Sequence, residues 1–112
     1  KVCLNTDIHK IILEISSNRL GATAVVNNNR QLLGIITDGD LRRMLEREDD
    51  YKHFRAQDIF TSNPLSIPED DLAVKALTIM RSKSISQLPV LDENGLYSGM
   101  IHLHDLIREG LI

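Results

Sequence analysis

The sequence has no tryptophan and few other aromatic residues, so its core must be built from aliphatic side chains. Phe and Tyr together make up 4% of the 112 residues. A single cysteine, Cys3, excludes an internal disulfide, and a reducing, cytoplasmic location is the expectation that follows. The net charge of −3 gives no basic surplus to neutralise phosphates, which argues against a nucleic-acid partner.

Long hydrophobic runs are also missing. No segment approaches the roughly 18 apolar residues that a membrane span requires, so we expect no membrane partner. A hydrophobic share of 42% with 26% charged residues is typical of a globular domain. Because either half alone would bury little surface, we expect the two halves to share one core.

What the sequence does contain is an internal repeat. Residues 34–43 align without a gap with residues 99–108, at an offset of 65. The repeat keeps polar residues in register as well as apolar ones, which predicts two related sites. Five residues are identical in the two copies: Gly34 and Gly99, Ile36 and Ile101, Asp40 and Asp105, Leu41 and Leu106, and Arg43 and Arg108.

The periodicity predicts the same elements in each copy: a helix, two strands joined by a tight turn, and a second helix. In the first copy, Asn5 or Thr6 caps the first helix, and the later elements span 23–26, 32–37 and 38–47, with Leu41, Met44 and Leu45 facing inward. In the second copy, a short strand at 65–67 precedes a helix that starts at Pro68, strands at 87–91 and 96–103, and a helix at 104–109 that Gly110 ends.

The repeat divides the chain into three parts. Residues 1–47 form the first copy, the charged and aperiodic residues 48–57 form a linker, and residues 58–112 form the second copy. The second copy has a lead-in, 58–66, with almost no counterpart in the first. We therefore expect the first copy to be truncated at its N-terminal end, with something upstream of Lys1.

The strand–helix junctions carry a family resemblance. The segment Gly34-Ile-Ile-Thr-Asp-Gly-Asp40 fits the glycine–hydrophobic–x–Thr/Ser–x–x–Asp motif of CBS domains, and the second copy departs from it only at His102. The chain thus resembles a CBS domain pair, or Bateman module. The resemblance implies an α/β (α+β) fold of tandem repeats with pseudo-twofold symmetry, in which small sheets share a core with helices outside.

A narrower resemblance rests on Thr37-Asp-Gly-Asp-Leu-Arg-Arg43 and His102-Leu-His-Asp-Leu106. These segments are similar to the C-terminal CBS pair of arabinose 5-phosphate isomerases. That family carries an N-terminal sugar isomerase (SIS) domain, which interconverts ribulose 5-phosphate and arabinose 5-phosphate for synthesis of the lipopolysaccharide sugar Kdo. The resemblance implies a regulatory module that lacks its catalytic domain here and self-associates as a dimer or tetramer.

Thr37 begins the first candidate site. We expect the amides from Asp38 to Leu41 to be free at the start of a helix, where the dipole favours a phosphate. Gly39 would let a ligand approach the backbone, and Asp40 could accept two ribose hydroxyls. Helix capping by Thr37 and Asp38 is the simpler alternative, but capping alone does not explain why aspartate recurs at Asp40 and Asp105.

Other candidate residues follow from the resemblance or from the second copy. The resemblance implies that Thr61 and Ser66, with Ile85 alongside, line the base of the ligand. His102 and His104 alternate at a strand end near Asp105, and three interpretations stay open: ligand contact, structural packing and, as the weakest, a metal site. Arg43 could pair with a phosphate, while Arg42 fits a solvated helix face equally well.

The sequence contains no nucleophile–base pair and no dinucleotide fingerprint, so we expect neither catalysis nor a cofactor in this chain by itself. The hypothesis is a regulatory module that senses a nucleotide, either the activated end product CMP-Kdo or an adenine nucleotide. The alternatives are an adenine-nucleotide module of another enzyme or transporter, and a purely structural dimerisation module.

Overall fold

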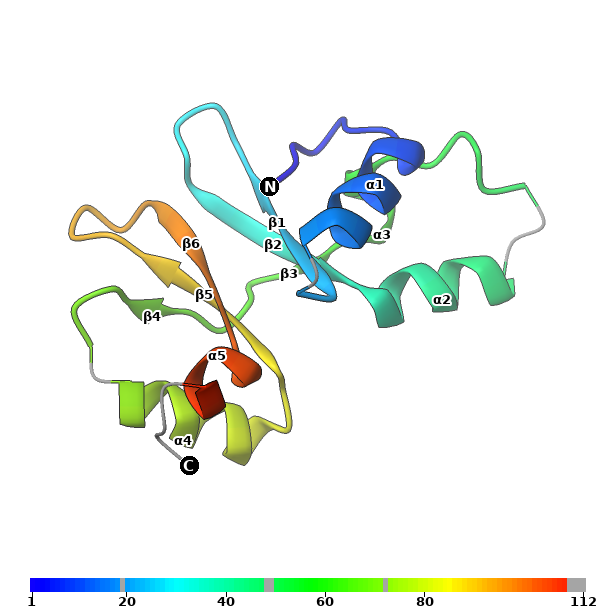
Figure 1. Cartoon of the computed structure of the whole chain (residues 1–112). Coiled ribbons are helices and arrows are strands. Elements are labelled where there is room, and N and C mark those ends of the chain that lie inside the picture. The colour runs from blue at the N-terminus through cyan, green and yellow to red at the C-terminus, as the bar shows by residue number, and fades with distance from the viewer. Residues whose placement is uncertain (19, 48–49, 72, 109–112) are drawn as a thin grey trace. The chain divides into compact units, whose positions relative to one another are not determined.

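A computed structural model describes residues 1–18, 20–47, 50–71 and 73–108 (Figure 1). The chain forms two compact units, residues 1–64 and 65–112, and each is described by itself. Helices are interspersed with strands along the chain, and the strands form two three-stranded sheets, which confirms the α/β (α+β) class. Within the described ranges, no helix combines the length and the apolar character needed to cross a membrane.

The first unit is a three-stranded antiparallel sheet with helices. Along the chain come α1 (Ile8–Asn18), β1 (Ala22–Val26), β2 (Leu32–Thr37), α2 (Asp38–Arg47), α3 (Ala56–Ile59) and β3 (Thr61–Ser62). The strand order is β1-β2-β3, with both pairs antiparallel. The bounds of β2 and α2 agree with the prediction, so the strand-to-helix junction lies where the motif placed it.

Helix α1 begins at Ile8, later than capping by Asn5 or Thr6 would place its start. Asp7 is the capping residue, because its carboxylate accepts the backbone N–H of Lys10 at 3.0 Å. This hydrogen bond lowers the pKa of Asp7. The prediction of Asn5 or Thr6 as the cap was wrong, since the Thr6 hydroxyl instead accepts the N–H of Cys3 within the preceding turn.

An aliphatic cluster fills the core of the first unit, as the lack of aromatic residues predicted. Met44 of α2 is buried in it and Leu41 packs against it, but Leu45 keeps 49% of its surface exposed. Leu45 was therefore wrongly placed inward. The buried members include residues of α1 and of both strands: Ile8, Ile11, Ile15, Val25 and Ile36.

The segment after α2 packs onto the first unit, although it was predicted as a linker. Ala56 is fully buried, and Tyr51 and Phe54 lie against the core cluster. Strand β3 then pairs with β2, with Ser62 opposite Gly34. Residues 48 and 49 of the predicted linker lie outside the described residues.

The second unit contains β4 (Ile67–Pro68), α4 (Ala73–Lys83), β5 (Gln87–Leu91), β6 (Tyr97–His102) and α5 (Leu103–Arg108). Its strand order is β4-β5-β6, with the first pair parallel and the second antiparallel. Pro68 belongs to a strand, so the predicted helix start there was wrong. The predicted helix end at Gly110 lies outside the described residues.

The repeat is visible in the hydrogen-bonding register of both units. A bulge follows Val25 in the first sheet and Val90 in the second, and each of these valines is opposite the repeated glycine, Gly34 or Gly99. Val2 bridges Val25 in parallel, as Ile67 pairs with Val90. Each unit has its own cluster of buried apolar residues, and the expected core shared between the copies stays a prediction.

Candidate functional site

The strand-to-helix junction of the first unit is organised around the carboxylate of Asp40. Thr37 is the last residue of β2, and Asp40 lies in the first turn of α2. The Thr37 N–H donates to Asp40 Oδ2 at 2.9 Å, and the Asp40 N–H donates to Thr37 Oγ1 at 3.2 Å. This reciprocal pair is a capping box, which satisfies two backbone donors at the helix start.

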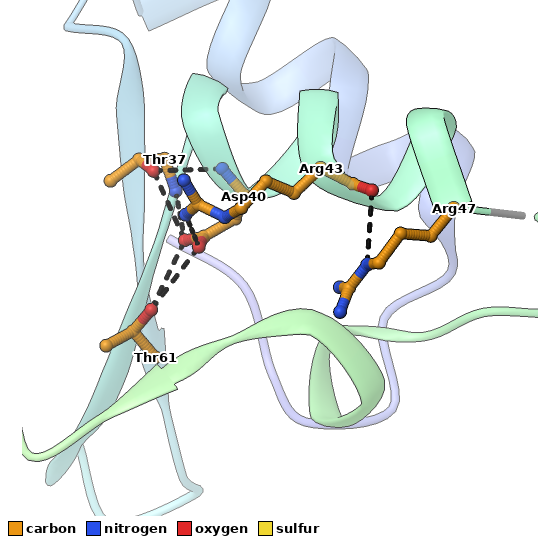
Figure 2. Close-up of polar contacts among 5 residues, drawn as sticks. All are labelled: Thr37, Asp40, Arg43, Arg47 and Thr61. Atoms are coloured by element: carbon orange, nitrogen blue, oxygen red, sulfur yellow. Dashed lines mark hydrogen bonds and ion pairs between the residues drawn. The ribbon is translucent and has the colours of Figure 1, made fainter.

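Two further side chains reach the same carboxylate (Figure 2). Arg43, one turn along α2, donates from Nη2 to Asp40 Oδ1 at 2.5 Å. Thr61 comes from β3, and its hydroxyl lies 3.4 Å from Oδ1 and 3.5 Å from Oδ2. Asp40 is only 8% exposed. A buried charge of this kind is stabilised only when its oxygens are well supplied with donors, as they are here.

Two of the four amides that the sequence analysis expected to be free are already engaged. The N–H of Asp38 donates to the carbonyl of Gly21 at 2.9 Å, and the N–H of Asp40 is taken by Thr37. The prediction of an open row of donors from Asp38 to Leu41 was therefore wrong. A phosphate at this helix start would have fewer backbone donors than that prediction assumed.

Gly39 lies beneath the guanidinium of Arg43. A Cβ placed on Gly39 would come within 3.3 Å of Arg43 Nη1 and 3.5 Å of Thr37 Oγ1. The backbone of α2 is thus bare of a side chain at this point, as close approach by a ligand requires. In this structure the space above it is taken by Arg43, whose own side chain is 58% exposed.

The second unit repeats the arrangement with a more open carboxylate. The N–H of His102 donates to Asp105 Oδ2 at 3.1 Å, and Arg108 Nη2 donates to Oδ1 at 2.5 Å. The hydrogen bond from the His102 backbone lowers the pKa of Asp105, and the Arg108 guanidinium acts in the same direction. The Asp105 side chain is 41% exposed, compared with 8% for Asp40.

Two imidazoles replace Thr37 and Gly39 in the second unit. The rings of His102 and His104 stack with centroids 4.7 Å apart and an interplanar angle of 13°. His102 Nδ1 accepts the backbone N–H of His104 at 3.0 Å, so the neutral ring caps the start of α5. Burial lowers the pKa of His102, the charge of His104 adds to this effect, and Asp105 opposes it.

Two further predicted site residues lie in the second unit. Ile85 packs against the apolar cluster of that unit, and its N–H donates to the carbonyl of Met80 at 3.0 Å. Ser66 is partly exposed just before β4. Among the described residues, no group of three or more His, Cys, Asp and Glu side chains is placed to hold a metal ion.

The comparison with known proteins decides the family. The sequence signature described as the CBS domain matches the chain twice, over residues 1–47 and 56–111. The chain belongs to the CBS domain family. Its two copies of the junction motif are therefore the two CBS motifs of a pair.

Curated relatives of this CBS pair include sugar-phosphate isomerases. The arabinose 5-phosphate isomerase KdsD of Francisella tularensis subsp. tularensis is 43% identical over 91% of this chain and 31% of the relative. The KdsD protein of Escherichia coli strain K12 is 36% identical over 90% of this chain and 30% of the relative. The chain thus spans about a third of the length of these relatives.

Solved structures support the CBS fold. A CBS domain protein from Pyrobaculum aerophilum, solved with AMP, has a TM-score of 0.81 at 23% identity, over 94% of this chain and 82% of that one. At that identity the likeness establishes the arrangement of the backbone only.

Sequence reasoning missed the structural role of the repeated aspartates. Asp40 and Asp105 each accept the N–H of the residue three positions earlier and an arginine three positions later. Capping therefore explains why aspartate recurs in both CBS copies, contrary to the earlier argument. The signal was present in the sequence, because Thr-x-x-Asp has the spacing of a capping box.

Proposed function

We propose that this CBS pair binds a nucleotide at the Asp40 junction of the first unit. The observation that carries the proposal is the buried carboxylate of Asp40, fixed between α2 and β3 with Gly39 beside it. A carboxylate accepts hydrogen bonds from two neighbouring hydroxyls, and a ribose diol supplies such a pair. The N-terminal end of α2 favours the negative charge of the phosphate.

We further propose that the module regulates a sugar-phosphate isomerase of the arabinose 5-phosphate isomerase type. The identity to two KdsD proteins over about nine-tenths of this chain supports this assignment. On this proposal the parent protein is cytoplasmic, carries an upstream SIS-type domain and assembles as a dimer or tetramer. CMP-Kdo is the proposed feedback ligand, since it combines a ribose, a phosphate and a carboxylate that Arg43 or the histidines could meet.

The test is calorimetric titration of the 112-residue chain with AMP, ATP, CMP and CMP-Kdo. Asp40→Asn removes the charge but leaves an oxygen that can accept the Thr37 N–H, so the helix start is retained. Asp105→Asn makes the same change in the second copy and serves as the matched control. We expect Asp40→Asn to weaken binding at least tenfold, because hydrogen bonds to a charged acceptor contribute about 1.5–3 kcal/mol.

A purely structural module is the second candidate, and one observation favours it. Every oxygen of the Asp40 carboxylate already has a donor within the chain, so the junction is satisfied without a ligand. This candidate predicts that none of the four nucleotides binds and that Asp40→Asn changes only stability. Binding that is tight but insensitive to Asp40→Asn would instead contradict the proposed site.

A further inference from the structure

Arg43 covers both features that the proposed nucleotide site would use. Its Nη2 donates to Asp40 Oδ1 at 2.5 Å, and its Nη1 lies 3.3 Å from the position that a Cβ on Gly39 would take. One guanidinium therefore occupies the acceptor for a diol and the bare backbone next to it. Figure 2 shows this side chain folded back from α2 onto the carboxylate.

The two oxygens of Asp40 differ in how firmly they are held. Oδ2 accepts the backbone N–H of Thr37 at 2.9 Å, and this bond is part of the helix cap. Oδ1 accepts mainly from Arg43, with the Thr61 hydroxyl farther away at 3.4 Å. The Thr37 hydroxyl also lies 3.2 Å from Oδ2. A carboxylate offers about four acceptor sites, two on each oxygen, so an incoming diol must use Oδ1 and needs the site that Arg43 fills.

Arg43 is also the donor that can leave most easily. Its side chain is 58% exposed, so the guanidinium can be hydrated as it swings away. The Thr37 donor is backbone, and the Thr61 donor belongs to a paired strand. The buried Asp40 carboxylate still needs a donor when Arg43 leaves, and the hydroxyls of the incoming diol supply it.

We propose that Arg43 is an intramolecular competitor of the ligand's ribose diol and so sets the selectivity for ribose over diol-free analogues. This inference rests on the proposed function, because it requires that the diol binds Asp40. The ligand-free site is closed by its own arginine, and binding exchanges one donor for two hydroxyls. Arg43 is a specificity-determining residue in this scheme.

The experiment measures the dissociation constants of AMP and of its 2′,3′-dideoxy analogue by calorimetry. Their ratio isolates the diol, because any effect of charge on the phosphate enters both constants equally. Arg43→Met keeps an unbranched side chain and removes the donor. Arg42→Met removes the same charge from the exposed neighbour on the same helix and is the control.

We expect the ratio of the dideoxy constant to the AMP constant to rise about two- to fivefold in Arg43→Met, the range measured for weak, solvent-screened ion pairs. It should stay unchanged in Arg42→Met. An unchanged or lower ratio in Arg43→Met overturns the inference. If the wild-type ratio exceeds one and collapses in Asp40→Asn, only the role of Arg43 has failed; if the wild-type ratio is one, the proposed function has failed as well.

Discussion

Thr37 and Asp40 each accept a backbone hydrogen bond from the other. The Asp40 carboxylate takes the N–H of Thr37, and the Thr37 hydroxyl takes the N–H of Asp40. The hydroxyl also lies 3.2 Å from Asp40 Oδ2, so its proton points to the carboxylate. The pair that would meet a ligand is therefore the pair that begins α2, and substitutions here affect stability and binding together.

Thr37→Val should destabilise the protein by about 1 kcal/mol, because it removes the acceptor for the Asp40 N–H. Thr37→Ser keeps the hydroxyl and should lie close to the wild type. Urea denaturation followed by circular dichroism measures both. Equal stability of Thr37→Val and Thr37→Ser would show that the cap contributes nothing.

Gly34→Ala and Gly99→Ala form a matched pair across the two copies. A Cβ on Gly34 would collide with the Phe60 ring and the carbonyl of Thr61, whereas a Cβ on Gly99 would meet nothing within 4 Å. Gly34→Ala should therefore cost about 1–3 kcal/mol and Gly99→Ala almost nothing.

The same pair should also separate in binding. The collision at Gly34 should push β3 and Thr61 away from Asp40. Gly34→Ala should therefore weaken the binding of AMP under conditions where the variant is still folded. Thermal midpoints and calorimetry with Gly99→Ala as the control test this. Equal behaviour of the two variants would contradict the proposed position of Phe60 and Thr61.

Thr23→Val should stabilise the protein by about 1 kcal/mol. Thr23 is 1% exposed, and its hydroxyl has no hydrogen-bond partner among the described residues. Valine has nearly the same shape and removes the unsatisfied group. The exposed Thr78, whose hydroxyl donates to the Val74 carbonyl, supplies the control Thr78→Val. A loss of stability in Thr23→Val would reveal a partner for the hydroxyl, such as a buried water.

Acid should destabilise the second unit through His102. The pKa of His102 is lower in the folded protein, mainly because of burial, so the unfolded chain binds its proton more readily. This contribution to stability is complete above about pH 6.5, the ordinary histidine value, and is lost as pH falls through the folded pKa. As pH is lowered from 8 to 5, the thermal midpoint should fall more steeply in the wild type than in His102→Thr, which restores a hydroxyl cap.

A proton NMR titration of the imidazole checks the same prediction directly. The His102 ring should titrate below the ordinary histidine value of about 6.5. His9→Gln, at an exposed position, is the control for the thermal measurement. Parallel pH profiles for the wild type and His102→Thr would contradict a role for His102 as a neutral cap.

We also expect self-association through the helices, and the exposed apolar side chains indicate which faces to test. Leu13 of α1 is 67% exposed and Leu45 of α2 is 49% exposed. If the proposed dimer buries these faces, Leu13→Asp with Leu45→Asp should raise the monomer fraction in sedimentation velocity. Val74→Asp, on α4 of the other unit, tests whether the second unit contributes. A wild type that stays monomeric at high micromolar concentration would exclude the dimer.

The sequence predicted the bounds of the helices and strands better than it predicted their tertiary contacts. The short apolar run of 32–37 and the acidic start of 38–47 are local signals, so β2 and α2 were found at their actual bounds. Leu45 follows the same periodicity as Met44 and was misplaced, because periodicity alone does not show which face of a helix is covered. The contact of Thr61 with Asp40 depends on β3 pairing with β2, a long-range fact that only the family resemblance implied.

Strand β3 has a consequence for how this protein can be dissected. Thr61 and Ser62 belong by sequence register to the second copy, yet they complete the sheet of the first unit. The boundary of the sequence repeat and the boundary of the compact unit therefore do not coincide. A fragment cut at the repeat boundary would leave β2 with an unpaired edge and Asp40 without Thr61. The boundary between the two compact units lies after Pro64, within the second repeat and not at its start.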